Sequence, residues 1–133
     1  MSVENLKKVS LGHYPTPIEK MENMTKLLGK GNLYIKRDDT TGPAFGGNKT
    51  RKLEYLMQEA LDGGYTAVMT FGGTQTNHGR TTVGAAVKLG LKPILVLSGG
   101  DTGYLSGNLN LDAMMGADIY FVKDPAKTAD VAA

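Results

Sequence analysis

The chain has 133 residues, which is enough for one modest domain with a hydrophobic core but not for two. Hydrophobic residues make up 41% and charged residues 21%, with 18 glycines, the balance of a globular protein rich in tight loops. The net charge of +2 favours neither nucleic acid nor a membrane surface as a partner. The lack of cysteine excludes disulfides, a cysteine nucleophile and thiolate metal sites. Because neither a signal-peptide core nor an apolar run of about 20 residues occurs, we expect a cytoplasmic protein.

The first part of the chain mixes turn signals with short regular elements. Residues 14–17 (Tyr-Pro-Thr-Pro) cannot form regular helix, because each proline biases the residue before it towards extended geometry. Apolar residues at helical spacing predict a helix over residues 18–28, and residues 33–37 predict a short strand. A glycine-containing loop is predicted over residues 40–48. The clearest predicted helix spans residues 50–61, with apolar side chains on one face and two glycines as its stop.

From residue 67 onwards, apolar strands alternate with helices. Strands that are apolar throughout and alternate with helices indicate a parallel sheet covered on both faces and connected by right-handed crossovers. The fold class predicted is therefore α/β, a parallel sheet with flanking helices. The predicted strands are 67–71, 94–97 and 119–122, the predicted helices are 80–89 and 105–115, and a further helix is predicted to begin near Pro125.

Two loops, residues 45–52 and 71–80, carry polar residues that serve no packing purpose. In a parallel α/β sheet, ligands collect where strands lead into helix N-termini. Lys49 lies at or just before a predicted helix start, where the positive helix end disfavours an ammonium ion. Imine formation with an aldehyde requires the neutral amine, and the glycine pair Gly46 and Gly47 lets a ligand approach the backbone closely. The alternative interpretation of Lys49 is a solvated charge at a basic helix start.

The second loop offers hydroxyl and amide groups at another predicted helix start. Residues 74–77 (Thr-Gln-Thr-Asn) are suited to bind a carboxylate or phosphate anion. They are equally suited to cap the helix, with Thr76 or Asn77 as the N-cap. His78 is more often a surface or capping residue than a catalytic one, and His13 is too distant in sequence to support a metal site.

Residues 42–50 also resemble a nucleotide-binding P-loop, which gives an alternative from a different class. Gly42 and Gly47 have the required separation, but Asn48 is inserted before the Lys-Thr pair. The insertion displaces the lysine and the magnesium-binding hydroxyl together. The next strand also ends in Phe-Gly-Gly instead of the acid that a nucleotide hydrolase places on its metal, so nucleotide binding stays a minor alternative.

Taken together, the two loops resemble those of a known enzyme family. Residues 45–54 (Phe-Gly-Gly-Asn-Lys-Thr-Arg-Lys-Leu-Glu) resemble the cofactor-lysine motif of the D-cysteine desulfhydrase and 1-aminocyclopropane-1-carboxylate (ACC) deaminase family. These are pyridoxal-phosphate enzymes of the tryptophan-synthase-β-like fold, fold type II. Supporting matches are residues 15–17 with Glu19, 33–39, 72–78, 107–109 and Leu111, so the resemblance runs from residue 14 to residue 122.

The resemblance implies a role for each residue of the two loops. Lys49 would bond covalently to the aldehyde of pyridoxal phosphate and later move the proton at the substrate Cα. Asn48 and Asn77 would belong to the cofactor site, Asn77 as a hydrogen-bond partner of the 3′-oxygen. The Thr76 hydroxyl would join Lys49 in catalysis. The substrate, a small amino acid, would be bound by Thr74, Gln75, Thr76, Asn77 and His78.

The resemblance also implies a domain organisation. Residues 1–45 would be the N-terminal segment of the large pyridoxal-phosphate domain, and residues 46–133 a small α/β domain that is incomplete at its C-terminal end. Family members are much longer, and the remainder supplies the phosphate-binding loop. We therefore expect a truncated form that binds the cofactor weakly by itself. A truncated domain exposes an apolar face, so a homodimer or other self-association is expected.

Two departures from the family pattern bear on the substrate. Thr76 stands where the family usually has serine, and His78 stands where ACC deaminases typically have glutamine. They favour a D-cysteine desulfhydrase-like reaction, in which β-elimination gives a 2-oxo acid, ammonia and sulfide. The alternatives are an ACC deaminase, or a non-catalytic fragment that only binds a ligand or a partner chain.

Overall fold

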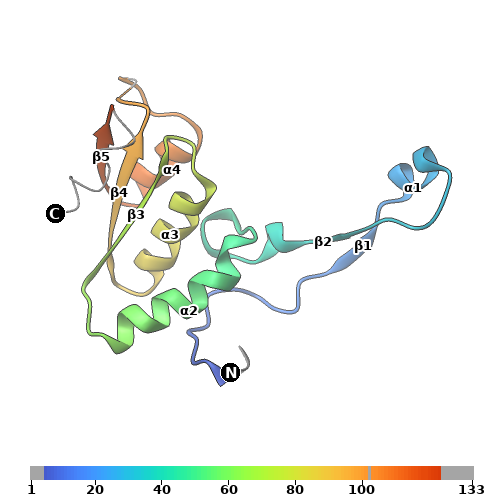
Figure 1. The fold of residues 1–133 in the computed structure, drawn as a ribbon, viewed down its shortest axis with the longest axis horizontal. Helices are drawn as coiled ribbons and strands as arrows, with labels where there is room; N and C mark the ends of the chain where they lie inside the picture. Colours follow the sequence, from blue (N-terminus) through green and yellow to red (C-terminus); the bar gives the residue numbers. More distant parts are fainter. Residues whose placement is uncertain (1–4, 102, 124–133) are drawn as a thin grey trace.

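The computed structural model describes residues 5–101 and 103–123, and in this part of the chain a narrow arm projects from an α/β body (Figure 1). The arm holds a two-stranded sheet and a short helix, and the body holds a three-stranded sheet with its helices. In chain order the elements are β1 (Ile18–Lys20), α1 (Glu22–Leu28), β2 (Tyr34–Lys36), the 3-10 turns η2 (Asp38–Thr40) and η3 (Pro43–Phe45), α2 (Lys49–Asp62), β3 (Ala67–Gly73), α3 (Asn77–Lys88), β4 (Lys92–Ser98), α4 (Gly107–Met114) and β5 (Asp118–Val122).

The sheet of the body confirms the predicted fold class. Its strands lie in the order β3-β4-β5, and both neighbouring pairs are parallel. Helices α3 and α4 make the two crossovers, as the alternation of strands and helices predicts. Helix α3 begins at Asn77 instead of residue 80, because the Thr76 side chain caps it. The helix predicted near Pro125 lies outside the described residues.

The helix predicted over residues 18–28 is wrong in its first part. Residues Ile18–Lys20 form β1, which pairs antiparallel with β2. The Met21 N–H then donates to the Leu33 carbonyl at 2.9 Å, so the chain before α1 is committed to sheet pairing. Pairing with a distant strand is a contact that the spacing of apolar residues within one segment does not reveal.

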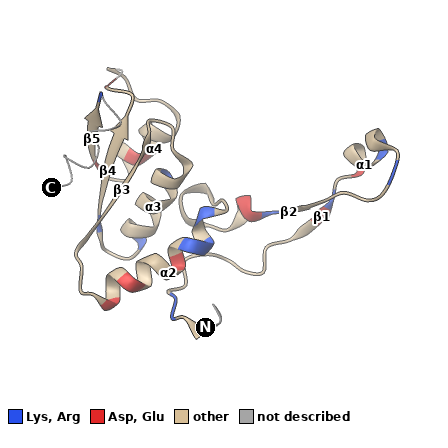
Figure 2. Cartoon of the chain, in the orientation of Figure 1, with Lys and Arg blue, Asp and Glu red and all other residues tan. Residues whose placement is uncertain are grey.

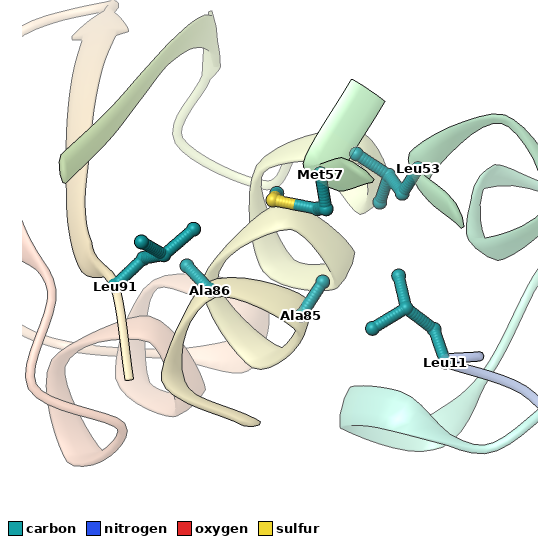
Figure 3. Packing of buried hydrophobic residues seen from close by; sticks show 6 residues of the cluster. All are labelled: Leu11, Leu53, Met57, Ala85, Ala86 and Leu91. Carbon is teal, nitrogen blue, oxygen red and sulfur yellow. The ribbon is translucent and has the colours of Figure 1, made fainter. Parts of the chain in front are cut away.

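Two clusters of buried apolar side chains form the core of the body. Helix α3 contributes to both, and its small Ala85 and Ala86 let α2 approach closely. Leu11 packs into the first cluster, so the segment before the arm is anchored to the body, and the division of the chain at residue 45 stays a prediction. The first cluster is Leu11, Leu53, Met57, Ala85, Ala86 and Leu91 (Figure 3), and the second is Val83, Leu95, Leu97 and Leu109.

Within the described residues, helices cover only one face of the parallel sheet. Leu95 and Leu97 of β4 point to that face and pack with α3 and α4, which lie on one side of the sheet (Figure 1). Met69, Phe71 and Tyr120 lie on the opposite face, where they are 40%, 43% and 50% exposed. The prediction of a sheet covered on both faces is therefore confirmed for one face within the described residues.

Candidate functional site

Lys49 is the first residue of α2 and is half-buried, which confirms its predicted place at a helix start. We call residues 45–49 the lysine loop. Gly46 and Gly47 have positive φ angles of 68° and 123°, a conformation that L side chains rarely adopt. A Cβ atom at Gly46 would also collide with the Asp39 carbonyl. The backbone conformation that leads into Lys49 therefore requires glycine at both positions.

Thr41 fixes the conformation of the lysine loop through buried hydrogen bonds. It is fully buried, and its Oγ1 accepts a hydrogen bond from the Gly47 N–H at 2.9 Å and lies 3.1 Å from the Thr50 Oγ1. The Gly47 N–H also donates to the Asp38 carbonyl at 2.8 Å. A buried hydroxyl whose bonding capacity is used in full rigidifies its surroundings, so Thr41 holds the loop in one conformation.

Arg51, in the first turn of α2, is held by a carboxylate. It donates from Nη2 and Nε to the two oxygens of Asp38 at 2.7 and 2.8 Å, and Thr16 donates to the same carboxylate at 2.9 Å. The Arg51 guanidinium lowers the pKa of Asp38 to about 2. The charge of Arg51 is therefore neutralised next to Lys49, which the sequence did not indicate.

The charges of α2 run against the preference of the helix dipole. Figure 2 shows the basic residues gathered at the start of the helix and the acidic residues along the rest of it. A helix is stabilised by acids at its start and bases at its end, so this arrangement does not serve the stability of α2. Within the described residues, Lys49 and Lys52 have no ion-pair partner. They leave positive potential around the lysine loop that suits an anionic ligand.

The second loop leads from β3 into α3, and Thr76 is the N-cap of that helix. Its Oγ1 accepts a hydrogen bond from the Gly79 N–H at 3.2 Å, so the capping interpretation of this loop is confirmed. Capping does not use all the donors at the helix start. The N–H groups of Asn77 and His78 have no acceptor one turn earlier within the helix, and they are available to an anion.

His78 lies in the first turn of α3. Its side chain is half-buried, and its Nδ1 lies 3.4 Å from the Thr82 Oγ1. Burial lowers the pKa of His78, and the positive charges of Lys52 and Lys49 lower it further. The neutral imidazole is the form favoured at this position.

Two further contacts join α3 to the lysine loop. Arg80 is buried, and its Nη2 donates to the Gly46 carbonyl at 3.5 Å. At Gly84 an added Cβ would lie 2.6 Å from the Cβ of Ala44 in η3, so α3 and η3 are in close contact. Thr41, Asp38 and Arg80 were not predicted as site residues, because each contacts the loop across a turn or from another element.

The other predicted site residues fall into two groups. Asn48 and Asn77 are exposed beside the paired loops, where a ligand can reach them, and Thr74 is half-buried. The Gln75 side chain instead faces α4, with its Nε2 donating to the Ser106 carbonyl at 3.0 Å. The structure thus places Asn48 and Lys49 at the start of α2 and Thr76, Asn77 and His78 at the start of α3, and it directs Gln75 towards α4.

The described ranges, 5–101 and 103–123, contain neither a metal-ligand cluster nor a membrane-spanning helix. No group of three or more histidine or acidic side chains there could hold a metal ion. No helix in those ranges is long and apolar enough to cross a membrane.

Known proteins resemble this chain in sequence and in structure. The chain is 42% identical over 126 residues to the 1-aminocyclopropane-1-carboxylate deaminase of Pseudomonas syringae pv. syringae, covering 90% of this chain and 37% of that protein. It is 46% identical over 125 residues to the enzyme of the same name from Variovorax paradoxus, covering 86% and 37%. A crystal structure of an ACC deaminase homologue superposes with a TM-score of 0.87 at 42% identity, covering 98% of this chain and 40% of that one.

These relatives are longer proteins, and the chain spans about 37% of the length of the two deaminases. None of these relatives carries the name of a desulfhydrase, so they do not support the substrate that Thr76 and His78 favour. The sequence profile of the family described as "Pyridoxal-phosphate dependent enzyme" matches residues 9–133, which include both loops of the site. This chain belongs to the family of pyridoxal-phosphate-dependent enzymes.

Proposed function

We propose that the protein is a pyridoxal-phosphate-dependent lyase or deaminase of small amino acids, with ACC deamination as the leading candidate reaction. The observation that carries the proposal is the position of Lys49 at the start of α2, after a glycine pair whose Gly46 carbonyl accepts a hydrogen bond from Arg80 of α3 at 3.5 Å. A primary amine next to a helix start is the combination that an aldehyde cofactor and a carboxylate substrate require.

The residues present fit the cofactor in their chemistry. When bound, pyridoxal phosphate supplies an aldehyde that bonds to amines and a pyridine ring that stores electrons from the substrate Cα. Lys49 supplies the amine, and it is the residue that we expect to take and return the proton at Cα. Asn77 supplies an amide to the ring oxygen, and Asn48 lies beside Lys49 in the same loop. The start of α3 supplies N–H groups and the Thr76 hydroxyl for the substrate carboxylate.

The choice of substrate rests on two observations that favour different reactions. The relatives named ACC deaminase, 42% and 46% identical, favour ACC as the substrate. Thr76 and His78 instead favour D-cysteine, as a second candidate. The pKa of His78 is lowered by burial and by Lys52 and Lys49, and a neutral imidazole near the substrate is the form that accepts a proton in a β-elimination. We further expect a cytoplasmic protein that acts as a homodimer.

The cofactor site is tested by reductive trapping. The chain is incubated with pyridoxal phosphate, reduced with borohydride and digested, and the modified lysines are identified by mass spectrometry. We expect one predominant label at Lys49, because it is half-buried at the end of the lysine loop, which α3 contacts through Arg80. The label should vanish in Lys49→Ala. Lys52→Ala is the matched control, since Lys52 is an exposed lysine in the same helix turn, and it should leave the label in place.

The outcome also separates the alternatives. Equal labelling of Lys49 and Lys52, or the same total yield in Lys49→Ala, would contradict a dedicated cofactor lysine. Release of 2-oxo acid is then followed with ACC, D-cysteine and L-cysteine as substrates. Predominant turnover of D-cysteine would favour the second candidate. Labelling without turnover of any of the three would indicate a fragment that only binds its ligand.

A further inference from the structure

The loop of Asn77 is clamped by the start of α4, across more than thirty residues of sequence. Asn108 donates from its Nδ2 to the Gln75 carbonyl at 2.9 Å and to the Asn77 Oδ1 at 3.0 Å. The backbone N–H of Asn108 also donates, to the Gln75 Oε1 at 2.9 Å. In the opposite direction, the Gln75 Nε2 donates to the Ser106 carbonyl at 3.0 Å. The two segments are thus joined by four hydrogen bonds.

The geometry at Gly107 shows how close the two segments are. Its φ angle of 52° is in the left-handed region, and a Cβ atom at this position would collide with the Gln75 Oε1. A glycine is therefore needed immediately before Asn108 for the clamp to close.

The clamp determines which way the Asn77 amide is turned. A backbone carbonyl can only accept, so the Asn108 atom that faces the Gln75 carbonyl must be the amide nitrogen. The second hydrogen of that nitrogen needs an acceptor, and the Asn77 Oδ1 is in place to receive it. The Asn77 Nδ2 then lies on the other side of its amide group, where no described residue accepts a hydrogen bond from it. Asn77 is consequently presented to a ligand as a donor.

We propose that Asn108 is a positioning residue, which holds the Asn77 side chain as a hydrogen-bond donor towards an anionic oxygen of the cofactor. This inference rests on the proposed cofactor site and assigns that site a residue outside its two loops. Without Asn108, the Asn77 amide is free to turn and present its oxygen, which would repel an oxyanion. With an aspartate at position 108, the amide is turned actively, since the carboxylate attracts the Asn77 Nδ2.

A first test needs no cofactor. The exchange of side-chain amide protons with solvent is measured by NMR for Asn108 and for Asn110, an asparagine of the same helix whose amide contacts Met114 at 3.7 Å. We expect the side-chain amide protons of Asn108 to exchange more slowly than those of Asn110. In Asn77→Ala, the Asn108 protons should exchange faster than they do in the unsubstituted chain. Equal rates at the two asparagines, or no response to Asn77→Ala, would show that the Asn77–Asn108 bond does not persist in solution.

The second test measures cofactor binding. The quantity compared is the pyridoxal phosphate concentration that half-saturates trapping at Lys49. Asn108→Leu lacks the amide donors, and Asn108→Asp keeps the size of the side chain but attracts the Asn77 Nδ2 instead of its Oδ1. We expect an increase of about three- to tenfold for the leucine variant, the cost of one hydrogen bond, and a larger one for the aspartate variant. The matched controls Asn110→Leu and Asn110→Asp should bind like the unsubstituted chain.

The results discriminate between this inference and the function on which it rests. Unchanged half-saturation in both Asn108 variants would overturn the positioning role. So would equal losses in the Asn110 variants, since these would reflect helix stability or charge alone. Absence of any label in the unsubstituted chain would contradict the proposed cofactor site instead, and the exchange measurement would then decide the orientation of Asn77.

Discussion

At the scale of single residues, Asp112 is the most unusual ionisable group of the body. It is fully buried in α4, and neither of its carboxylate oxygens has a hydrogen-bond partner among the described residues. Burial raises the pKa of Asp112 to about 6, although the nearby charge of Arg80 acts in the opposite direction. Arg80 is itself buried with its Nε and Nη1 unpartnered, and no ion pair joins it to Asp112 within the described residues.

Asp112 should make the free energy of unfolding depend on pH. The unfolded chain releases the Asp112 proton near pH 4, whereas the folded chain holds it to about pH 6. Between these values the folded state binds more protons, so its stability falls as pH rises, by about 2–3 kcal/mol in total. Asp112→Asn should remove this slope and raise the stability at pH 7. Urea unfolding between pH 4 and 7 measures both effects.

The control for this prediction is Asp62→Asn, which changes an acid near the exposed end of α2 and should leave the slope in place. A stability that rises between pH 4 and 6, and no longer does so in Asp112→Asn, would contradict the prediction. It would show that Arg80 holds Asp112 as a carboxylate.

At the scale of elements, the contact between α3 and η3 determines where the lysine loop begins. The contact depends on Gly84, whose missing side chain lets the backbone of η3 lie against the helix. In an open helix, replacing glycine by alanine stabilises the helix by about 1 kcal/mol. Here we expect Gly84→Ala to lower the free energy of unfolding by about 1–3 kcal/mol, because the added methyl group overlaps Ala44. Denaturant unfolding measures the difference.

A compensating substitution provides the control. Ala44 has a φ angle of 47°, which glycine adopts more readily than alanine. Ala44→Gly removes the overlapping methyl group, so Gly84→Ala should cost less in that background. If Gly84→Ala lowered the free energy of unfolding equally with and without Ala44→Gly, its effect would not arise from the contact with Ala44.

At the scale of the whole molecule, the face of the sheet with Met69, Phe71 and Tyr120 should govern association. Exposed apolar faces of this kind mark interaction surfaces, and parallel sheets are normally covered on both sides. We expect the sedimentation coefficient of the chain to rise with concentration, and the double variant Phe71→Ser, Tyr120→Ser to suppress that rise. Tyr65→Ser is the control, since Tyr65 is 65% exposed and lies outside this face. A chain that sediments as a monomer at all concentrations would exclude self-association through this surface.

The sequence was most informative where structure is encoded locally. Apolar runs bounded by glycines predicted β3, β4 and β5, and apolar side chains on one face followed by a glycine pair predicted α2. Such signals depend only on residues close in sequence, so they predict secondary structure without knowledge of tertiary contacts. The predicted helix over residues 18–28 failed in its first turn, because the partner of β1 is a strand encoded later in the chain.

What the sequence by itself determined about this protein is its α/β class, its family and the position of Lys49 at a helix start. Only the tertiary structure decided how that site is held together. The contacts of Asn108 with Asn77, of Arg80 with Gly46 and of Arg51 with Asp38 join residues 31, 34 and 13 positions apart. Side-chain pairs at such separations leave no periodic signal in one sequence. The contact of Asn108 with Asn77 exists because the crossovers of a parallel sheet bring the starts of α3 and α4 to one edge, and the other two exist because the turns before α2 fold back onto the helices.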